Sequence, residues 1–341
     1  MPPPPGLPDG RRPTLADVAA RADVSTALVS IVMRGAKGAS AATRERVLEA
    51  ARAIGYRPDS RARLLRSNRT HLIGVQFEIQ EPFHTDLVEH LYAAAESVGY
   101  QIALSPVAAG RSERQAVESL LGDRCEALIL LGSRAPAARL GELAALLPLV
   151  SVARRLRPVV PGVHVVRTAD DKGARQAVDH LVALGHRAIV HIDGGRAPGA
   201  AERRRGYRTA MNRHGLADRV RILPGGIAAE DGAAAATALL ATAPRPSAVL
   251  AFNDACATGA LSTFFRAGVA VPGEISVVGF DDSRLAGLPH VDLTTVAQDI
   301  PRMARLAISH VTARLEAGGT GAGEDVVEPR LVTRGTTASV G

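Results

Sequence analysis

The sequence predicts an α/β protein in which a small N-terminal three-helix domain with a helix-turn-helix core precedes two doubly wound, parallel-sheet α/β subdomains. Three observations favour this fold class. The excess positive charge is concentrated at the start of the chain, helix signals with a tight turn occupy residues 14–55, and short β-rich runs alternate with amphipathic helices from residue 71 onward. At 341 residues, the chain is long enough for several domains.

The charge distribution indicates what the N-terminal domain binds. Residues 1–70 hold 13 Lys and Arg against 6 Asp and Glu, whereas the remaining 271 residues hold 28 of each kind. Charge concentrated in this way is typical of a nucleic-acid-binding domain. Aromatic residues make up only 3% of the chain, which disfavours a stacking platform for single strands. We expect the proline-rich residues 1–12 to be a disordered tail.

Three helix starts are visible in the basic segment. Thr14 begins a capping-box-like sequence, Ser25 starts a second helix after a turn at Asp23, and Ser40 caps a third helix that ends before Gly55. The turn spacing together with the charge favours binding of double-stranded DNA over a helical bundle that is basic by chance.

Residues 14–35 (TLADVAARADVSTALVSIVMRG), residues 40–67 (SAATRERVLEAARAIGYRPDSRARLLRS) and the downstream segments resemble the LacI/GalR family of bacterial transcription regulators, from Thr14 to about Thr337. The resemblance implies that the second helix enters the major groove. It also implies a hinge helix over about Asp59 to Arg66 that forms on the operator and inserts Leu65 into the minor groove, with Ala62 one turn before it.

The positions that read bases depart from the family pattern. Thr26 and Ala27 are short, Ile31 stands where the family usually has a guanine-reading Arg, and Arg34 stands where it usually has Asn. We therefore expect readout through methyl contacts, Arg34, the hinge and phosphates, with Ser25, Ser30, Thr43 and Tyr56 best placed for phosphates. The residues expected to contact DNA are Thr14, Ser25, Thr26, Ala27, Ser30, Ile31, Arg34, Thr43, Tyr56, Asp59, Ala62 and Leu65.

From residue 71 the pattern predicts parallel sheets with helices on both faces and a ligand in the cleft at the carboxyl ends of the strands. Helices are expected over residues 86–100 and 173–186, and residues 321–328 are expected to be a loop leading into a last short strand. The predicted strands cover residues 72–77, 101–106, 127–132, 147–153, 188–193, 247–252 and 275–280.

The resemblance implies an architecture similar to periplasmic sugar-binding proteins, in which the chain crosses three times between the two subdomains. We expect the helix-turn-helix domain over residues 13–58, the hinge helix and linker over 59–70, and an effector-binding core over 71–337. Within that core, the first subdomain is expected to comprise about 71–166 and 298–325, and the second about 167–297 and 326–337.

Polar side chains follow the predicted strands, where a ligand in the cleft would meet them. The resemblance places Arg203, Asn253, Asp281 and Gln298 in the pocket, and Phe83 and His84 complete the expected ligand-binding set. Carboxylate, amide and guanidinium groups pair well with vicinal hydroxyls, and Phe83 could stack on a sugar face. Alternatively, Asn253 and Asp281 only cap the helices that follow them, as is expected of Asp170 and Asp171.

These observations predict a sequence-specific, ligand-responsive transcription regulator that represses carbohydrate-utilisation genes. Its partners would be a pseudo-palindromic operator, a sugar-like effector and a second copy in a homodimer. An activator, or a corepressor type that responds to a purine or another metabolite, remains open. A sugar-binding transport protein would not need the basic domain, and an enzyme of the doubly wound class would need a phosphate loop or nucleophile elbow that the sequence lacks.

Two cysteines in apolar contexts, Cys125 and Cys256, are expected to be reduced core residues, and we expect no metal site and no cofactor. The chain has neither an apolar signal region near its start nor a run of 18 apolar residues, which predicts a cytoplasmic protein, associated with the nucleoid when bound to DNA, and no membrane partner. The resemblance implies that a tetramer would need an extra C-terminal heptad helix; the sequence ends without heptads, so a dimer is expected.

Overall fold

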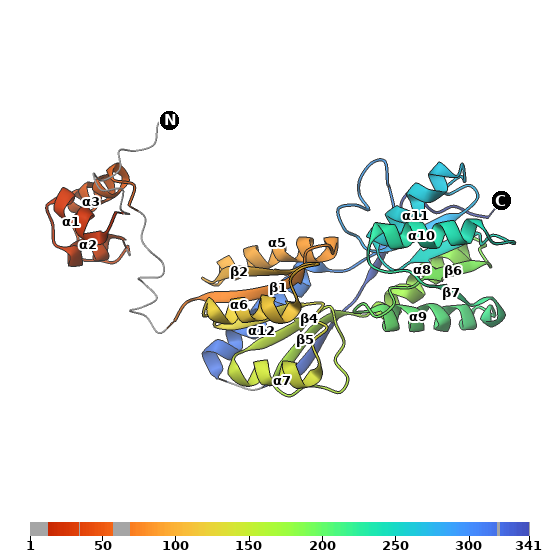
Figure 1. The fold of residues 1–341 in the computed structure, drawn as a ribbon, viewed down its shortest axis with the longest axis horizontal. Helices are drawn as coiled ribbons and strands as arrows, with labels where there is room; N and C mark the ends of the chain where they lie inside the picture. Colours follow the sequence, from red (N-terminus) through yellow and green to blue (C-terminus); the bar gives the residue numbers. More distant parts are fainter. Residues whose placement is uncertain (1–12, 34, 57–68, 319–320, 341) are drawn as a thin grey trace. The chain divides into compact units, whose positions relative to one another are not determined.

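The computed structural model describes residues 13–33, 35–56, 69–318 and 321–340 (Figure 1). These residues fall into two compact units that divide between Thr70 and His71, here called the head and the core. The predicted tail (1–12), Arg34 and the hinge residues Asp59, Ala62 and Leu65 lie outside the described residues.

The described residues of the head form three helices, α1 (Leu15–Ala22), α2 (Thr26–Met33) and α3 (Ala41–Ala53), which pack around Val18, Val29 and Val47. The predicted capping box is present, because Thr14 Oγ1 accepts from the N–H of Asp17 and the Asp17 carboxylate accepts from the N–H of Thr14. The turn that follows α1 places Asp23 in the left-handed region at φ 51°.

Lobe 1 of the core is a six-stranded parallel sheet in the order β11-β5-β4-β3-β1-β2. Helices α5 and α12 pack on one face of the sheet, and α6 and α7 pack on the other. Its strands are β1 (Leu72–Glu78), β2 (Gln101–Val107), β3 (Ala127–Leu131), β4 (Leu149–Val152), β5 (Val163–Thr168) and β11 (Gly323–Val327), and its helices are α5 (Pro82–Ser97), α6 (Glu113–Gly122), α7 (Ala137–Leu146) and α12 (Ile300–Ala317).

Lobe 2 repeats this plan in the order β12-β10-β9-β8-β6-β7, with only β12 antiparallel to its neighbour. Helices α8 and α9 cover one face, and α10 and α11 cover the other. Its strands are β6 (Ile189–Ile192), β7 (Arg221–Leu223), β8 (Ala248–Ala251), β9 (Ser276–Asp281), β10 (Thr294–Ala297) and β12 (Arg330–Val332), and its helices are α8 (Asp170–Ala183), α9 (Ala200–Arg213), α10 (Ala229–Leu240) and α11 (Asp254–Arg266), with a short 3₁₀ turn at Ala217–Arg219.

The prediction of a loop over residues 321–328 is wrong, because this segment contains β11, the edge strand of lobe 1. Its sequence has a low apolar content because two of its acidic side chains meet partners on β5: Glu324 pairs with Arg167, and Asp325 with His164. β5 is not among the predicted strands either, because its polar residues His164 and Arg167 interrupt the apolar pattern.

Three connections join the lobes, at residues 169, 298–299 and 328–329, which follow β5, β10 and β11. One predicted crossover, at residues 297–298, coincides with the end of β10, whereas those at 166–167 and 325–326 fall inside β5 and β11. Each lobe is therefore assembled from segments that lie far apart in the sequence.

Helices α10 and α11 approach each other closely because glycine stands at both contact points. A Cβ atom on Gly232 would lie 1.8 Å from the carbonyl oxygen of Cys256, and one on Gly259 would lie 1.8 Å from that of Ala229. Such close backbone contact requires glycine. Among the described residues, no helix combines the length and the apolar content needed to cross a bilayer.

Candidate functional site

A cavity of about 270 Å³ lies between the lobes of the core. In lobe 1 the strand order reverses beside β1, between β2 and β3, and in lobe 2 it reverses beside β6, between β7 and β8. Doubly wound sheets bind ligands at the carboxyl ends of strands flanking such a switch point. The cavity is lined there by Glu78, Gly132, Pro198 and Phe252, so both switch points open onto one site.

Five of the six predicted ligand-binding residues line this cavity: Phe83, His84, Arg203, Asp281 and Gln298. The sixth, Asn253, is not among the lining residues. Its Oδ1 accepts from the N–H of Cys256 at 2.8 Å and so caps α11, which is the alternative considered above. Its Nδ2 donates to Glu81 Oε1 at 3.0 Å, and thereby positions a residue that does line the cavity.

Arg203 is the buried cation of the site. From α9 its Nε donates to Asp170 Oδ1 at 2.9 Å, Nη1 donates to the carbonyl of Phe252 at 2.7 Å, and Nη2 lies 3.3 Å from Asp281 Oδ1. Burial acts to lower the pKa of Arg203, but the carboxylates of Asp281 and Asp170 raise it overall, so the guanidinium stays charged. The Cζ of Arg203 also lies 3.6 Å from the centroid of the Phe280 ring, and this stacking fixes the plane of the guanidinium group.

Asp281 ends β9 with a backbone φ of 116°, a conformation that L side chains rarely adopt. It accepts from Gln298 Nε2 at 2.7 Å, and burial raises its pKa to about 6 despite the nearby Arg203. Behind it, Asp254 accepts from the N–H of Ser283 at 2.7 Å and from Thr295 Oγ1 at 2.5 Å. Asp254 therefore holds the turn that presents Asp281.

Four acidic lining residues were not assigned to the site from the sequence: Glu78, Glu81, Glu113 and Asp170. Glu81 precedes α5. Its pKa is raised to about 8, mainly by burial and secondly by repulsion from Asp281, so it carries a proton at neutral pH. The prediction that Asp170 is a helix cap is wrong, because Ala169 occupies the N-cap of α8, and Asp170 is buried against Arg203. Asp171, also predicted as a cap, instead bonds to Arg175 at 2.8 Å.

His84 and Phe83 face the cavity in different ways. His84 Nδ1 accepts from the N–H of Glu78 at 3.1 Å, and burial lowers its pKa to about 4, so the ring is neutral. Phe83 is only 3% exposed and packs mainly in the lobe 1 core. Nearby, the buried Oε1 of Gln76 has no hydrogen-bond partner among the described residues, which leaves an acceptor for a ligand.

The cavity carries more acidic than basic side chains. Acidic residues outnumber arginines there by five to two, so that with Glu81 protonated four acidic residues still face two arginines, and the histidine that lines the cavity is neutral. A phosphorylated or carboxylated ligand would meet repulsion, whereas hydroxyl or amino groups would find acceptors. The acidic residues are Glu78, Glu81, Glu113, Asp170 and Asp281, and the arginines are Arg134 and Arg203.

In the head, the start of α2 presents three exposed small residues, Ser25, Thr26 and Ala27. Ser25 Oγ accepts from the N–H of Leu28 at 3.2 Å and caps the helix. Ile31 is half-buried beside the turn after α2, since a Cβ on Gly38 would lie 3.6 Å from its Cγ2.

The residues of the head that are predicted to contact DNA differ in what their side chains already bind. Thr43 Oγ1 shares a hydrogen bond of 2.8 Å with Ser40 Oγ at the start of α3, and Thr14 Oγ1 bonds the Asp17 carboxylate at 2.7 Å. Ser30 and Tyr56 are half-buried. The hydroxyls of Thr14 and Thr43 therefore already make hydrogen bonds at the starts of α1 and α3.

Both the head and the core match families of known proteins. Residues 14–59 match the bacterial regulatory proteins of the lacI family, and residues 178–337 match a periplasmic binding protein-like domain. The HTH-type transcriptional repressor CytR of Escherichia coli (strain K12) is 32% identical over 334 residues, which cover 96% of this chain and 97% of CytR. The chain belongs to the lacI family.

Solved structures of lacI-family proteins agree with this membership. A LacI transcriptional regulator from a Rhodococcus species is 49% identical, with a TM-score of 0.76 over 79% of this chain and 99% of its own. The transcriptional regulator CelR in complex with cellobiose is 30% identical (TM-score 0.70, 95% and 100% covered), and the lac repressor dimer bound to operator and the anti-inducer ONPF is 28% identical (TM-score 0.80, 96% and 100% covered). The predicted family, fold class and regulatory function are confirmed.

Proposed function

We propose that this lacI-family chain is a repressor whose head binds a pseudo-palindromic operator and whose core binds a small polyhydroxylated effector. The observation that carries the effector site is the Arg203, Asp281 and Gln298 cluster, which lies in a cavity at the switch points of both lobes. Paired donors and acceptors of this kind suit vicinal hydroxyl groups. The cavity would bind its ligand without converting it, and so would have no catalytic role.

A neutral sugar fits the cavity better than an acidic one, because carboxyl groups outnumber arginines there. CelR, which is 30% identical to this chain, has been solved with cellobiose. This likeness supports a sugar-like effector for the present chain. The second candidate is a purine or similar metabolite, which the aromatic rings of Phe83 and Phe252 at the cavity would favour.

A homodimer would place two heads on the two half-sites of an operator, as in the operator-bound lac repressor dimer. Lobe 1 offers exposed apolar side chains for such an interface on and around α5 and β2, at Tyr92, Val98 and Leu104. We keep the proposed division into a head (13–58), a hinge helix and linker (59–70) and a core (71–337), and propose a cytoplasmic location.

The hinge would couple the two sites. An effector that binds one arrangement of the lobes more tightly shifts the population toward it and changes the spacing of the two hinge segments in a dimer. An inducer would then lower operator affinity, whereas a corepressor would raise it.

The first test is selection of bound duplexes from a random pool at physiological salt, without added ligand. A recovered palindrome supports the regulator and defines the operator. The same operator then serves in a binding assay against a panel of neutral mono- and disaccharides, sugar phosphates and purines. A neutral sugar that changes operator affinity supports the proposal; a response only to a purine or a phosphorylated sugar would overturn the effector class while leaving DNA binding intact.

A further inference from the structure

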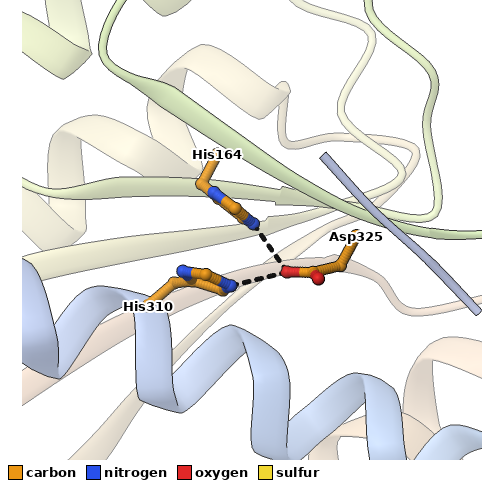
Figure 2. A group of neighbouring side chains, drawn as sticks. All are labelled: His164, His310 and Asp325. Atoms are coloured by element: carbon orange, nitrogen blue, oxygen red, sulfur yellow. Dashed lines mark hydrogen bonds and ion pairs between the residues drawn. The ribbon is translucent and has the colours of Figure 1, made fainter. Parts of the chain in front are cut away.

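Three side chains that can bind a metal ion converge in lobe 1, and none of them lines the effector cavity. His164 on β5 and His310 on α12 direct their Nε2 atoms at the same carboxylate oxygen of Asp325 on β11, at 2.8 and 2.6 Å (Figure 2). The two imidazole rings stack with their centroids 3.4 Å apart. One ligand atom of each residue lies within 4.8 Å of the others.

Glycine makes room for this arrangement. Gly323 pairs with His164 in the register of the β5–β11 pair. A Cβ atom on Gly323 would lie 2.8 Å from Cε1 of the His164 ring, which is closer than carbon atoms approach without overlap. The absence of a side chain at this position therefore lets the ring lie across the two strands toward Asp325.

Two imidazole nitrogens and one carboxylate oxygen form a common donor set for zinc, with water completing a tetrahedral site. Around an ion with bonds of about 2.0 Å, the ligand atoms would separate to about 3.3 Å. The side chains of His310 and Asp325 are 33% and 37% exposed, so they are free to make this small adjustment and leave a path for the ion and its water.

We propose that lobe 1 binds one Zn²⁺ ion through His164, His310 and Asp325. The sequence predicts no metal site, because His164 lies 161 positions from Asp325 and the ligand spacing shows no motif. Only the pairing of β11 with β5, under the helix α12, brings the three together.

The ligands lie on the three elements that lead into or out of the connections between the lobes. β5 and β11 run into residues 169 and 328–329, and α12 begins directly after residues 298–299. One ion would therefore cross-link all three segments on the lobe 1 side. Its largest effect would be on β11, an edge strand that has only β5 as a neighbour in the sheet.

The test uses the untagged full-length protein, stripped with a chelator and dialysed. Titration with zinc chloride by calorimetry should give one ion per chain with a dissociation constant of about a micromolar or tighter. Zinc should raise the melting temperature by several degrees and slow amide exchange in residues 323–327. Cobalt bound in place of zinc should show the visible absorption of a four-coordinate site.

His310→Gln and Asp325→Asn should each weaken zinc binding at least tenfold and abolish the thermal shift. Both variants keep a polar side chain of similar size, and their metal-free melting temperatures report whether they fold. The matched control is His214→Gln, which removes another histidine that pairs with a single carboxylate, that of Asp179, at 2.7 Å. This variant should bind zinc as the wild type does.

Two results would overturn the proposal. The first is no saturable zinc binding by the folded wild type up to about a hundred times the expected constant; the cluster would then be a hydrogen-bonded His–Asp–His group only. The second is binding that survives in His310→Gln and Asp325→Asn, which would place the ion elsewhere on the chain.

Discussion

The side-chain amide of Asn253 in lobe 2 donates a hydrogen bond to Glu81 Oε1 in lobe 1 at 3.0 Å, although the two residues are 172 positions apart in the sequence. A second contact between the lobes lies nearby, where Arg284 pairs with Asp86 at 3.2 Å and with Glu89. The first contact is partly buried and the second is exposed. The protonation state of Glu81 therefore bears on how the two lobes meet.

The stability of the core should fall as the pH rises, in part because of Glu81. Its pKa is about 8 in the folded protein against an ordinary value of 4.5, so between these values the folded chain holds a proton that the unfolded chain has lost. The stabilisation is complete below about pH 4.5 and is lost as the pH rises through about 8. Glu81→Gln, which stays uncharged, should melt a few degrees above the wild type at pH 9 and match it at pH 4.5.

Thermal unfolding across this pH range without ligand measures the effect. The control Glu96→Gln alters an exposed acid on the same helix and should follow the wild-type curve. Parallel curves for Glu81→Gln and the wild type would show that Glu81 is ionised throughout.

Asp281→Asn should weaken effector binding about tenfold to a hundredfold, because it removes the charged acceptor that orders Arg203 and Gln298. The fold should persist, since the guanidinium keeps its bond to Asp170. Calorimetry with the identified effector measures the loss. Asp282→Asn is the matched control, because Asp282 binds Arg334 and does not line the cavity. Unchanged affinity in Asp281→Asn would refute its role.

Leu65→Ala should weaken operator binding at least tenfold while leaving effector binding intact, because resemblance to the family assigns this residue to the minor-groove wedge. Fluorescence anisotropy with the selected operator measures this. Leu64→Ala, at the adjacent position, should have a smaller effect. Equal operator affinities for Leu65→Ala and the wild type would show that Leu65 does not act as the minor-groove wedge.

Arg44→Met should destabilise the head by about 1–2 kcal/mol. The guanidinium of Arg44 donates to the carbonyl of Val32 at 3.3 Å and to that of Ala36 at 2.8 Å, and so holds the end of α2 against α3. Calorimetric unfolding should show the loss in the transition of the head. The control Arg46→Met changes an exposed arginine of the same helix and should leave that transition in place. A shift of equal size in both variants would mean that charge, and not the two bonds, sets the stability.

Local signals were enough to predict the head and the longer strands. Thr14 and its capping box act over three residues, and the apolar runs of β3 and β9 are buried throughout. In contrast, polar residues of β5 and β11 pair with each other across 157 to 161 positions of sequence, as in Arg167–Glu324 and His164–Asp325. No local pattern records such a pairing.

The cavity residues divide in the same way. Asp281 and Gln298 follow or flank strand ends, so their place at the site could be predicted. Glu81 could not, because its burial depends on Asn253 in the other lobe. Asp170 follows β5, and since that strand was not predicted, the aspartate was interpreted as the cap of an isolated helix.

The three connections between the lobes also set the order in which the protein can be completed as it is synthesised. The three helices described in the head have been synthesised once residue 53 is added, but lobe 1 lacks α12 and β11 until residue 327, and lobe 2 lacks β12 until residue 332. At about 5–20 residues per second, roughly 15 to 50 seconds of translation separate the end of α3 from the end of β11. During that interval the face of lobe 1 that α12 covers is open to chaperones or to other nascent chains. A premature stop near residue 300 would therefore leave both lobes unfinished, while the DNA-binding helices are already made.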